Sequence, residues 1–167
     1  MMPEKAREYL LAALAGTPEV LERLLAGVHA EDRRWDFRPD SSRFTLREAV
    51  AHLADWEPIH VERLCRLRDE TDPSLPDVDE GEVAIENDYA HSDPHGSLEW
   101  MRAGRQQLLH ALETLPADAW TRPGLREGVG HITIESFVAM IAGHDGYHLR
   151  QVAQWLTLAD LALPEEG

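Results

Sequence analysis

Apolar side chains recur at helical spacing in four stretches of the chain. The first covers residues 3–28 and the second residues 45–68, the third begins between Ser92 and Ser97 and ends at Leu115, and the fourth covers residues 133–159. In each stretch the apolar residues fall on one helical face, as packing against a core requires. The pattern therefore predicts four amphipathic α-helices.

Two of these helices carry clear start signals. Thr45 and Glu48 form a capping box, in which each side chain binds a backbone N–H at the helix start. Thr133 can cap the fourth helix in the same way. Pro18 and Pro58 lie inside the first and second helices, where we expect them to bend the chain.

The connections between the predicted helices are polar. Residues 71–93 are rich in Asp, Glu and Pro, and no connecting segment shows the alternation that predicts a strand. The sequence thus predicts an all-α fold, a four-helix bundle with a long polar loop between its second and third helices. We expect the acidic part of that loop, residues 77–86, to cover the mouth of any site in the bundle.

The chain repeats itself weakly at an offset of 88 residues. Phe44-Thr45 at the start of the second helix corresponds to Ile132-Thr133 at the start of the fourth, and a tryptophan and an Arg-Pro pair precede both. One interpretation is that two helical hairpins pack together. The alternative is coincidence, because capped amphipathic helices resemble one another.

Composition and charge indicate a single globular domain and limit the kinds of partner that it can bind. With 167 residues, 43% of them apolar and 28% charged, the chain is expected to form one domain over residues 1–167. Sixteen basic and 31 acidic residues give a net charge of −15, and no segment concentrates the basic ones, so nucleic acid and anionic membranes are not expected partners. The single cysteine, Cys65, cannot form an internal disulfide and is expected to be an inert core thiol, and a cytoplasmic location fits.

The candidate chemistry lies in the second and fourth helices. His144 and His148 are four residues apart, so one helical turn places both imidazoles on the same face. That face also carries apolar residues and should point inward, where a pair of histidines needs a partner. His52, among apolar residues of the second helix, can supply it. The three residues predict a divalent-metal site inside the bundle, and the alternative is three core histidines bonded to the backbone.

Other residues compete for roles at this site. His60, two turns beyond His52, is an alternative third ligand, and His131 follows a glycine-rich segment from which it could reach the site. The remaining candidates for a hydrogen bond to an imidazole, or for substrate contact, are Asp55, Trp56, Glu57, Asp145, Tyr147 and Arg150. Alternatively, each of these residues has no role at the site and either lies on the helix flank or packs against its neighbours.

Three strings resemble the DinB/YfiT-like superfamily of bacterial four-helix-bundle metalloenzymes. They are residues 51–57 (AHLADWE), 133–136 (TIES) and 143–152 (GHDGYHLRQV), and the last is the most specific. The resemblance implies that His52, His144 and His148 hold the metal, and it implies an up-down-down-up bundle that is often dimeric. Phe44-Thr45 stands where many relatives carry Trp-Ser.

The resemblance also implies a reaction class, because the branches with known activity use a low-molecular-weight thiol. Three histidines leave a coordination position open, and an ion there can produce a thiolate or a hydroxide near pH 7. The first hypothesis is a thiol S-transferase that acts on small electrophiles. The alternatives are a metal-dependent hydrolase with Asp55 or Glu57 as general base, and a non-enzymatic metal-binding or interaction module. Zinc or nickel is expected first, with iron as a further candidate.

Overall fold

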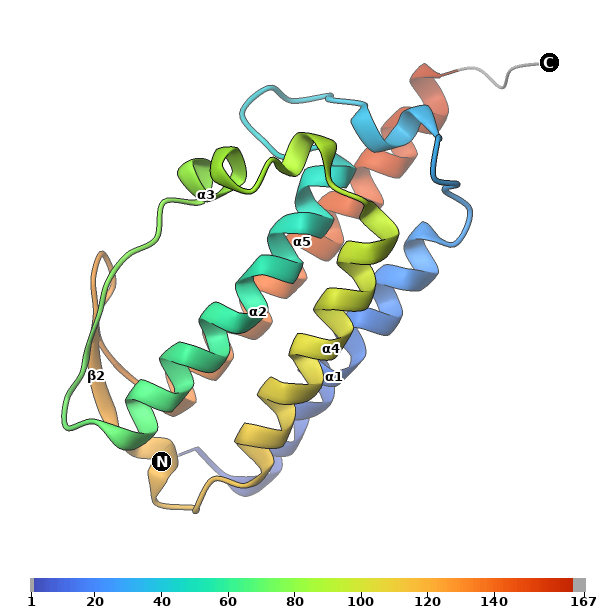
Figure 1. The fold of residues 1–167 in the computed structure, drawn as a ribbon. Coiled ribbons are helices and arrows are strands. Elements are labelled where there is room, and N and C mark those ends of the chain that lie inside the picture. Colours follow the sequence, from blue (N-terminus) through green and yellow to red (C-terminus); the bar gives the residue numbers. More distant parts are fainter. Residues whose placement is uncertain (1, 164–167) are drawn as a thin grey trace.

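The computed structural model describes residues 2–163, and four long α-helices account for most of them. These are α1 (Glu4–Leu25), α2 (Leu46–Asp69), α4 (Pro94–Glu113) and α5 (Ile134–Ala162), and they coincide with the four predicted helices (Figure 1). A short helix, α3 (Glu80–Glu86), lies between α2 and α4. Three 3-10 turns complete the helical part, at Arg33–Asp36, Tyr89–His91 and Ala119–Thr121.

The helix starts follow from local side-chain chemistry. Thr45 and Glu48 form the predicted capping box of α2, and Thr133 and Ser136 form an equivalent one at the start of α5. Asp93 caps α4, whose first residue is Pro94. Both α1 and α2 continue past their internal prolines.

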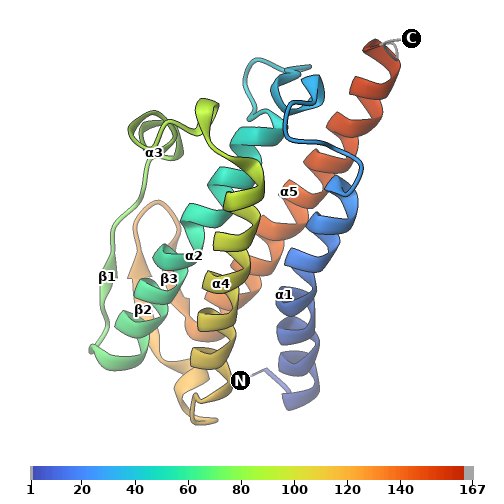
Figure 2. The same ribbon diagram turned by 45° about the vertical axis from the view of Figure 1, so that its right-hand side comes forward.

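The four long helices form a bundle in which sequence neighbours are not spatial neighbours. The chain runs up in α1, down in α2, down again in α4 and up in α5 (Figures 1 and 2). The helix pairs in extensive contact are α1 with α4 and α5, and α2 with α4 and α5. Consecutive helices α1 and α2 therefore lie across the diagonal, as do α4 and α5, and the interpretation as two packed hairpins is wrong.

A small sheet lies where no strand was predicted. Strand β1 (Ser74–Leu75) pairs in parallel with β2 (Pro123–Arg126), which pairs antiparallel with β3 (Gly130–Thr133). The strands have two to four residues, too few to show a period of two in the sequence. Gly124 belongs here because a Cβ at this position would lie 2.5 Å from the Leu67 side chain.

The segment between α2 and α4 is consequently more ordered than a polar loop. It contains β1, α3 and one 3-10 turn. Because α2 and α4 run in the same direction, this segment has to return along the length of the bundle (Figure 2). On the way it passes beside α2, and α3 comes to line the same cavity as His148.

Two apolar clusters form the core. One contains Leu14, Leu64, Leu108 and Phe137, and the other contains Leu21, Trp35, Leu53 and Trp155. Cys65 is free and half-buried, so it lies at the edge of the core and not inside it as expected. Within residues 2–163, no helix is long and apolar enough to cross a membrane.

Candidate metal centre

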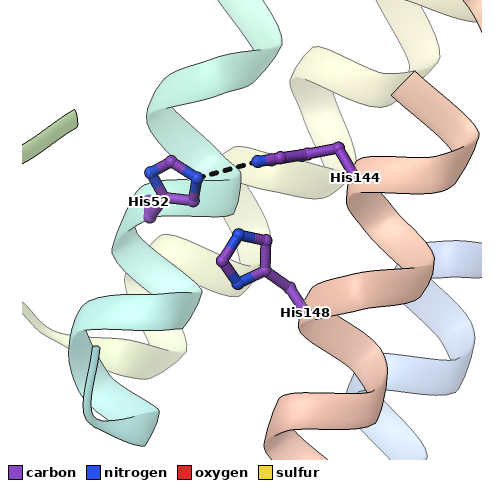
Figure 3. Close-up of side chains that lie close together, drawn as sticks. All are labelled: His52, His144 and His148. Carbon is purple, nitrogen blue, oxygen red and sulfur yellow. Dashed lines mark hydrogen bonds between the residues drawn. The ribbon is translucent and has the colours of Figure 1, made fainter. Parts of the chain in front are cut away.

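Helices α2 and α5 bring three predicted histidines together. His52 projects from α2 toward His144 and His148, which lie on successive turns of α5 (Figure 3). One nitrogen from each ring lies within 4.8 Å of the other two. Nε2 of His52 is 2.8 Å from Nε2 of His144, a hydrogen bond in which one ring donates. We call these three residues the histidine cluster.

Burial keeps the histidine cluster uncharged. His52 is fully buried and His148 is 3% exposed. Desolvation, and next the neighbouring histidines, lower the pKa of His52 to about 2. Desolvation also lowers the pKa of His144 and that of His148 to about 4. All three imidazoles are therefore neutral at pH 7, which is the form that binds a metal ion.

Gln151 fixes the tautomer of His148. The side-chain nitrogen of Gln151 lies 2.7 Å from the carbonyl oxygen of Phe44, so the amide group must donate there. Its oxygen then faces Nδ1 of His148 at 3.0 Å, and Nδ1 must carry the proton. Nε2 of His148 is left as a free acceptor, as a ligand nitrogen has to be.

The donor set fits a divalent metal ion. Three neutral imidazoles from two helices converge, and Nδ1 of His52 and Nδ1 of His144 are buried without a hydrogen-bond partner in the described structure. Three protein ligands leave at least one position open, as catalytic sites do. The histidine cluster can therefore hold an ion that still accepts an outside ligand.

The other candidate histidines lie outside the cluster. His60 is buried, and its ring is 6.1 Å from that of His144 and edge-on to Phe137 at 6.0 Å. His131 is exposed on β3. Within residues 2–163, the one group of histidine, cysteine or acidic side chains close enough to share an ion is His52, His144 and His148.

The carboxylates next to the histidines in sequence have other partners. Glu57 and Asp145 both bind Arg105 of α4, with shortest distances of 2.6 Å in each case. Asp55 accepts a hydrogen bond from Asn87 at 2.6 Å and lines a separate cavity with Trp100. Neither predicted general base, Asp55 or Glu57, is free to act at the histidine cluster.

Arg105 ties all four long helices together. Each of its three guanidinium nitrogens donates a hydrogen bond, to Glu57 of α2, to Asp145 of α5 and to the carbonyl oxygen of Leu14 in α1. Thr17 of α1 adds a hydrogen bond to Asp145 at 2.8 Å. Asp145 follows His144 directly, so this buried ionic network holds the backbone that carries a candidate ligand.

The remaining neighbours pack against the cluster or face away. The Trp56 ring lies 4.3 Å from that of His52 and is 4% exposed, which makes it a packing residue. The Tyr147 ring lies edge-on to His148 at 5.0 Å and is 43% exposed. Arg150 is exposed and lies away from the cluster, over a groove on the outer face of α5.

One member of the histidine cluster, His148, borders a cavity of about 580 Å³. His148 and Gln151 lie on one wall, and the segment before α2, including Arg43 and Phe44, forms another. Four residues of α3 line the cavity as well: Glu80, Gly81, Ala84 and Ile85. That the acidic segment 77–86 covers the mouth of the site stays a prediction. This size is within the range for small-molecule sites in proteins.

The chain belongs to the DinB superfamily, whose family model matches residues 6–152. Among solved structures it is similar to YfiT from Bacillus subtilis, with a TM-score of 0.85 and 20% identity over 93% of this chain and 88% of that one. YfiT is described as a probable metal-dependent hydrolase with an unusual four-helix bundle topology. No curated protein matches the sequence.

Proposed function

We propose that His52, His144 and His148 bind one divalent metal ion, and that the protein uses it to transfer a low-molecular-weight thiol to a small electrophile. The observation that carries this proposal is the convergence of three neutral imidazoles beside an open cavity. Zinc or nickel is the proposed ion, with iron as the alternative, because imidazole suits all three. We also predict that the protein forms a homodimer and is located in the cytoplasm.

The bound ion would lower the pKa of a thiol or a water molecule so that it is a nucleophile near pH 7. The chain's own residues prepare the site for it. Gln151 presents Nε2 of His148, while the rings of Phe44 and Trp56 pack on His52 and exclude water from that side. Residues of α3 line the cavity, where they would limit access from solvent.

A thiol is favoured over water because of where the carboxylates lie. Asp55 and Glu57, the carboxylates nearest to His52 in sequence, are engaged elsewhere, so an attacking water would depend on Glu80 of α3 to take its proton. A thiol has an ordinary pKa near 8.5 and needs far less help to lose its proton. In the transfer, the thiolate sulfur forms a bond to the electrophilic carbon, the leaving group departs with the electron pair, and the thiol proton goes to solvent.

A metal-dependent hydrolase is the second candidate, favoured by the description of YfiT. The carboxylate that this chemistry would use is Glu80 of α3, an exposed side chain that lines the cavity. It would accept the proton of the attacking water. Asp55 and Glu57, which the sequence predicted as general bases, would not take part in this hydrolysis.

One pair of assays separates these functions. Metal-loaded protein is mixed with 1-chloro-2,4-dinitrobenzene and cysteine, glutathione or coenzyme A, and separately with p-nitrophenyl acetate in thiol-free buffer. Thiol transfer predicts chloride release that depends on a thiol and is lost in His144→Ala. Ester hydrolysis without thiol, lost in His144→Ala and in Glu80→Gln, would instead establish the hydrolase.

A further inference from the structure

Arg43 is an unpaired cation on the wall of the cavity. Its Nε and one of its terminal nitrogens are buried and have no hydrogen-bond partner in the described structure. Within residues 2–163 the Arg43 side chain forms no ion pair, in a protein with a net charge of −15, and its charge acts on Asp40, three residues earlier, only as a minor cause of that residue's lowered pKa. Arg38, which lines the same cavity, is by contrast bound to Glu48 at 2.7 and 2.8 Å.

Aromatic rings hold the Arg43 side chain in place. Its guanidinium carbon lies 4.5 Å from the centre of the Trp155 ring and 5.0 Å from that of Tyr147. These contacts orient a cation but leave its N–H groups unsatisfied. A guanidinium with unsatisfied buried donors costs stability, so the arrangement points to a ligand that completes it.

The backbone of the residue after Arg43 is held to α5. The carbonyl oxygen of Phe44 accepts hydrogen bonds from Gln151 at 2.7 Å and from Trp155 at 2.9 Å. Gln151 also orients His148, so one side chain ties the segment that carries Arg43 to a residue of the histidine cluster. Arg43 and His148 both line the same cavity.

We infer that Arg43 binds the carboxylate of a small anionic ligand whose reactive atom lies at the histidine cluster. The planar guanidinium matches a carboxylate with two parallel hydrogen bonds. The carboxylates that face this cavity are Glu48, which is already paired with Arg38, and Glu80 on α3. The inference rests on the proposed function, because it specifies the class of small molecule that reaches the ion.

The test compares two thiols that differ in one group. Cobalt(II)-loaded protein is titrated with 3-mercaptopropionate and with its neutral analogue 3-mercaptopropionamide, and the sulfur-to-cobalt absorption band is followed. The wild type should bind the carboxylate about tenfold more tightly, which corresponds to ~1.4 kcal/mol. Arg43→Gln should abolish this preference, whereas Arg150→Gln, which removes an equal charge from the outer face of α5, should keep it.

A measurement without metal separates failure of carboxylate binding by Arg43 from failure of metal binding by the histidine cluster. In 15N-labelled protein without metal, the Nε–H signal of Arg43, identified by its loss in Arg43→Gln, should shift with propionate and not with propionamide. That shift without cobalt binding would support the inference and refute the proposed metal site. Three results would overturn the inference. In the cobalt titration, these are equal affinity of the wild type for both thiols, or a preference for the carboxylate thiol that survives in Arg43→Gln. In the NMR measurement, it is an Arg43 signal that shifts with inorganic phosphate and not with propionate.

Discussion

Nδ1 of His148 donates a hydrogen bond to the side-chain oxygen of Gln151, three residues further along α5 and 3.0 Å away. The carbonyl oxygen of Phe44 fixes the Gln151 amide from the other side. This chain of contacts links the segment before α2 to a candidate ligand on α5. It aims Nε2 of His148 at the space shared with His52 and His144.

Replacing Gln151 should therefore weaken metal binding without removing a ligand. We expect Gln151→Ala to lower the affinity for zinc about 10–100-fold, because His148 loses the partner that fixes its tautomer and ring orientation. Competition with a chromophoric chelator measures this affinity. Gln154→Ala, on the exposed side of the same helix, is the matched control, and equal affinities in the two variants would contradict the role of Gln151.

Arg105 is expected to be essential for stability. Arg105→Met leaves the carboxylates of Glu57 and Asp145 buried without their cation, and the free energy of unfolding should fall by ~3–5 kcal/mol. Urea unfolding followed by circular dichroism measures it. Arg102→Met on the same helix breaks an exposed ion pair with Glu22 and should cost less than about 1 kcal/mol. Equal losses of unfolding free energy in the two variants would show that the buried network of Arg105 does not stabilise the bundle more than an exposed ion pair does.

Gly104 allows α4 to approach α2 closely. A Cβ at this position would overlap the side chain of Glu57, so Gly104→Ala should destabilise the protein by ~1–3 kcal/mol despite alanine's better helix propensity. Gly16→Ala in α1 meets open space and should instead stabilise by ~0.5–1 kcal/mol. Thermal unfolding of both variants checks the opposite signs, and stabilisation by Gly104→Ala would contradict the close contact.

The buried histidines make the metal-free protein sensitive to acid. The pKa values of His52, His144 and His148 are about 2, 4 and 4 in the folded state, against ~6.5 in an unfolded chain. Below pH 6.5 the unfolded chain binds protons that the folded protein does not, so stability present at pH 7 is lost as the pH falls.

The three groups together should contribute a slope of up to ~4 kcal/mol per pH unit between pH 6 and pH 5. Urea unfolding of the metal-stripped protein at pH 7, 6 and 5 measures it. His52→Gln should reduce the slope, and His131→Gln, at an exposed position, should leave it unchanged. A free energy of unfolding that does not change from pH 7 to pH 5 would contradict burial of neutral imidazoles.

The sequence predicted the features that depend on local chemistry. The capping signals at Thr45 and Thr133 located two helix starts, because a cap needs only neighbouring residues. Apolar periodicity then placed all four long helices. The three histidines were predicted to converge, since helical spacing fixed His144 and His148 on one face, and the structure brings His52 to them.

The features that were missed depend on distant parts of the chain. The diagonal placement of α1 and α2 depends on which helices pack against each other, and no local sequence pattern specifies that packing. Nothing near Arg105 in sequence indicates that Glu57 and Asp145 are its partners, 48 and 40 residues away. Gln151 did carry a signal, because it lies three residues after His148 and therefore on the same helical face.

Elemental analysis of the purified protein, without an affinity tag and beside His144→Ala and His148→Ala, shows whether the three histidines bind a metal ion. We expect close to one zinc, nickel or iron per chain in the wild type. Both variants should lose that metal and keep the far-ultraviolet helical signal, because the apolar core does not need the ion. Absence of metal from the wild type, even after reconstitution, or equal metal content in all three proteins would contradict metal binding by the three histidines.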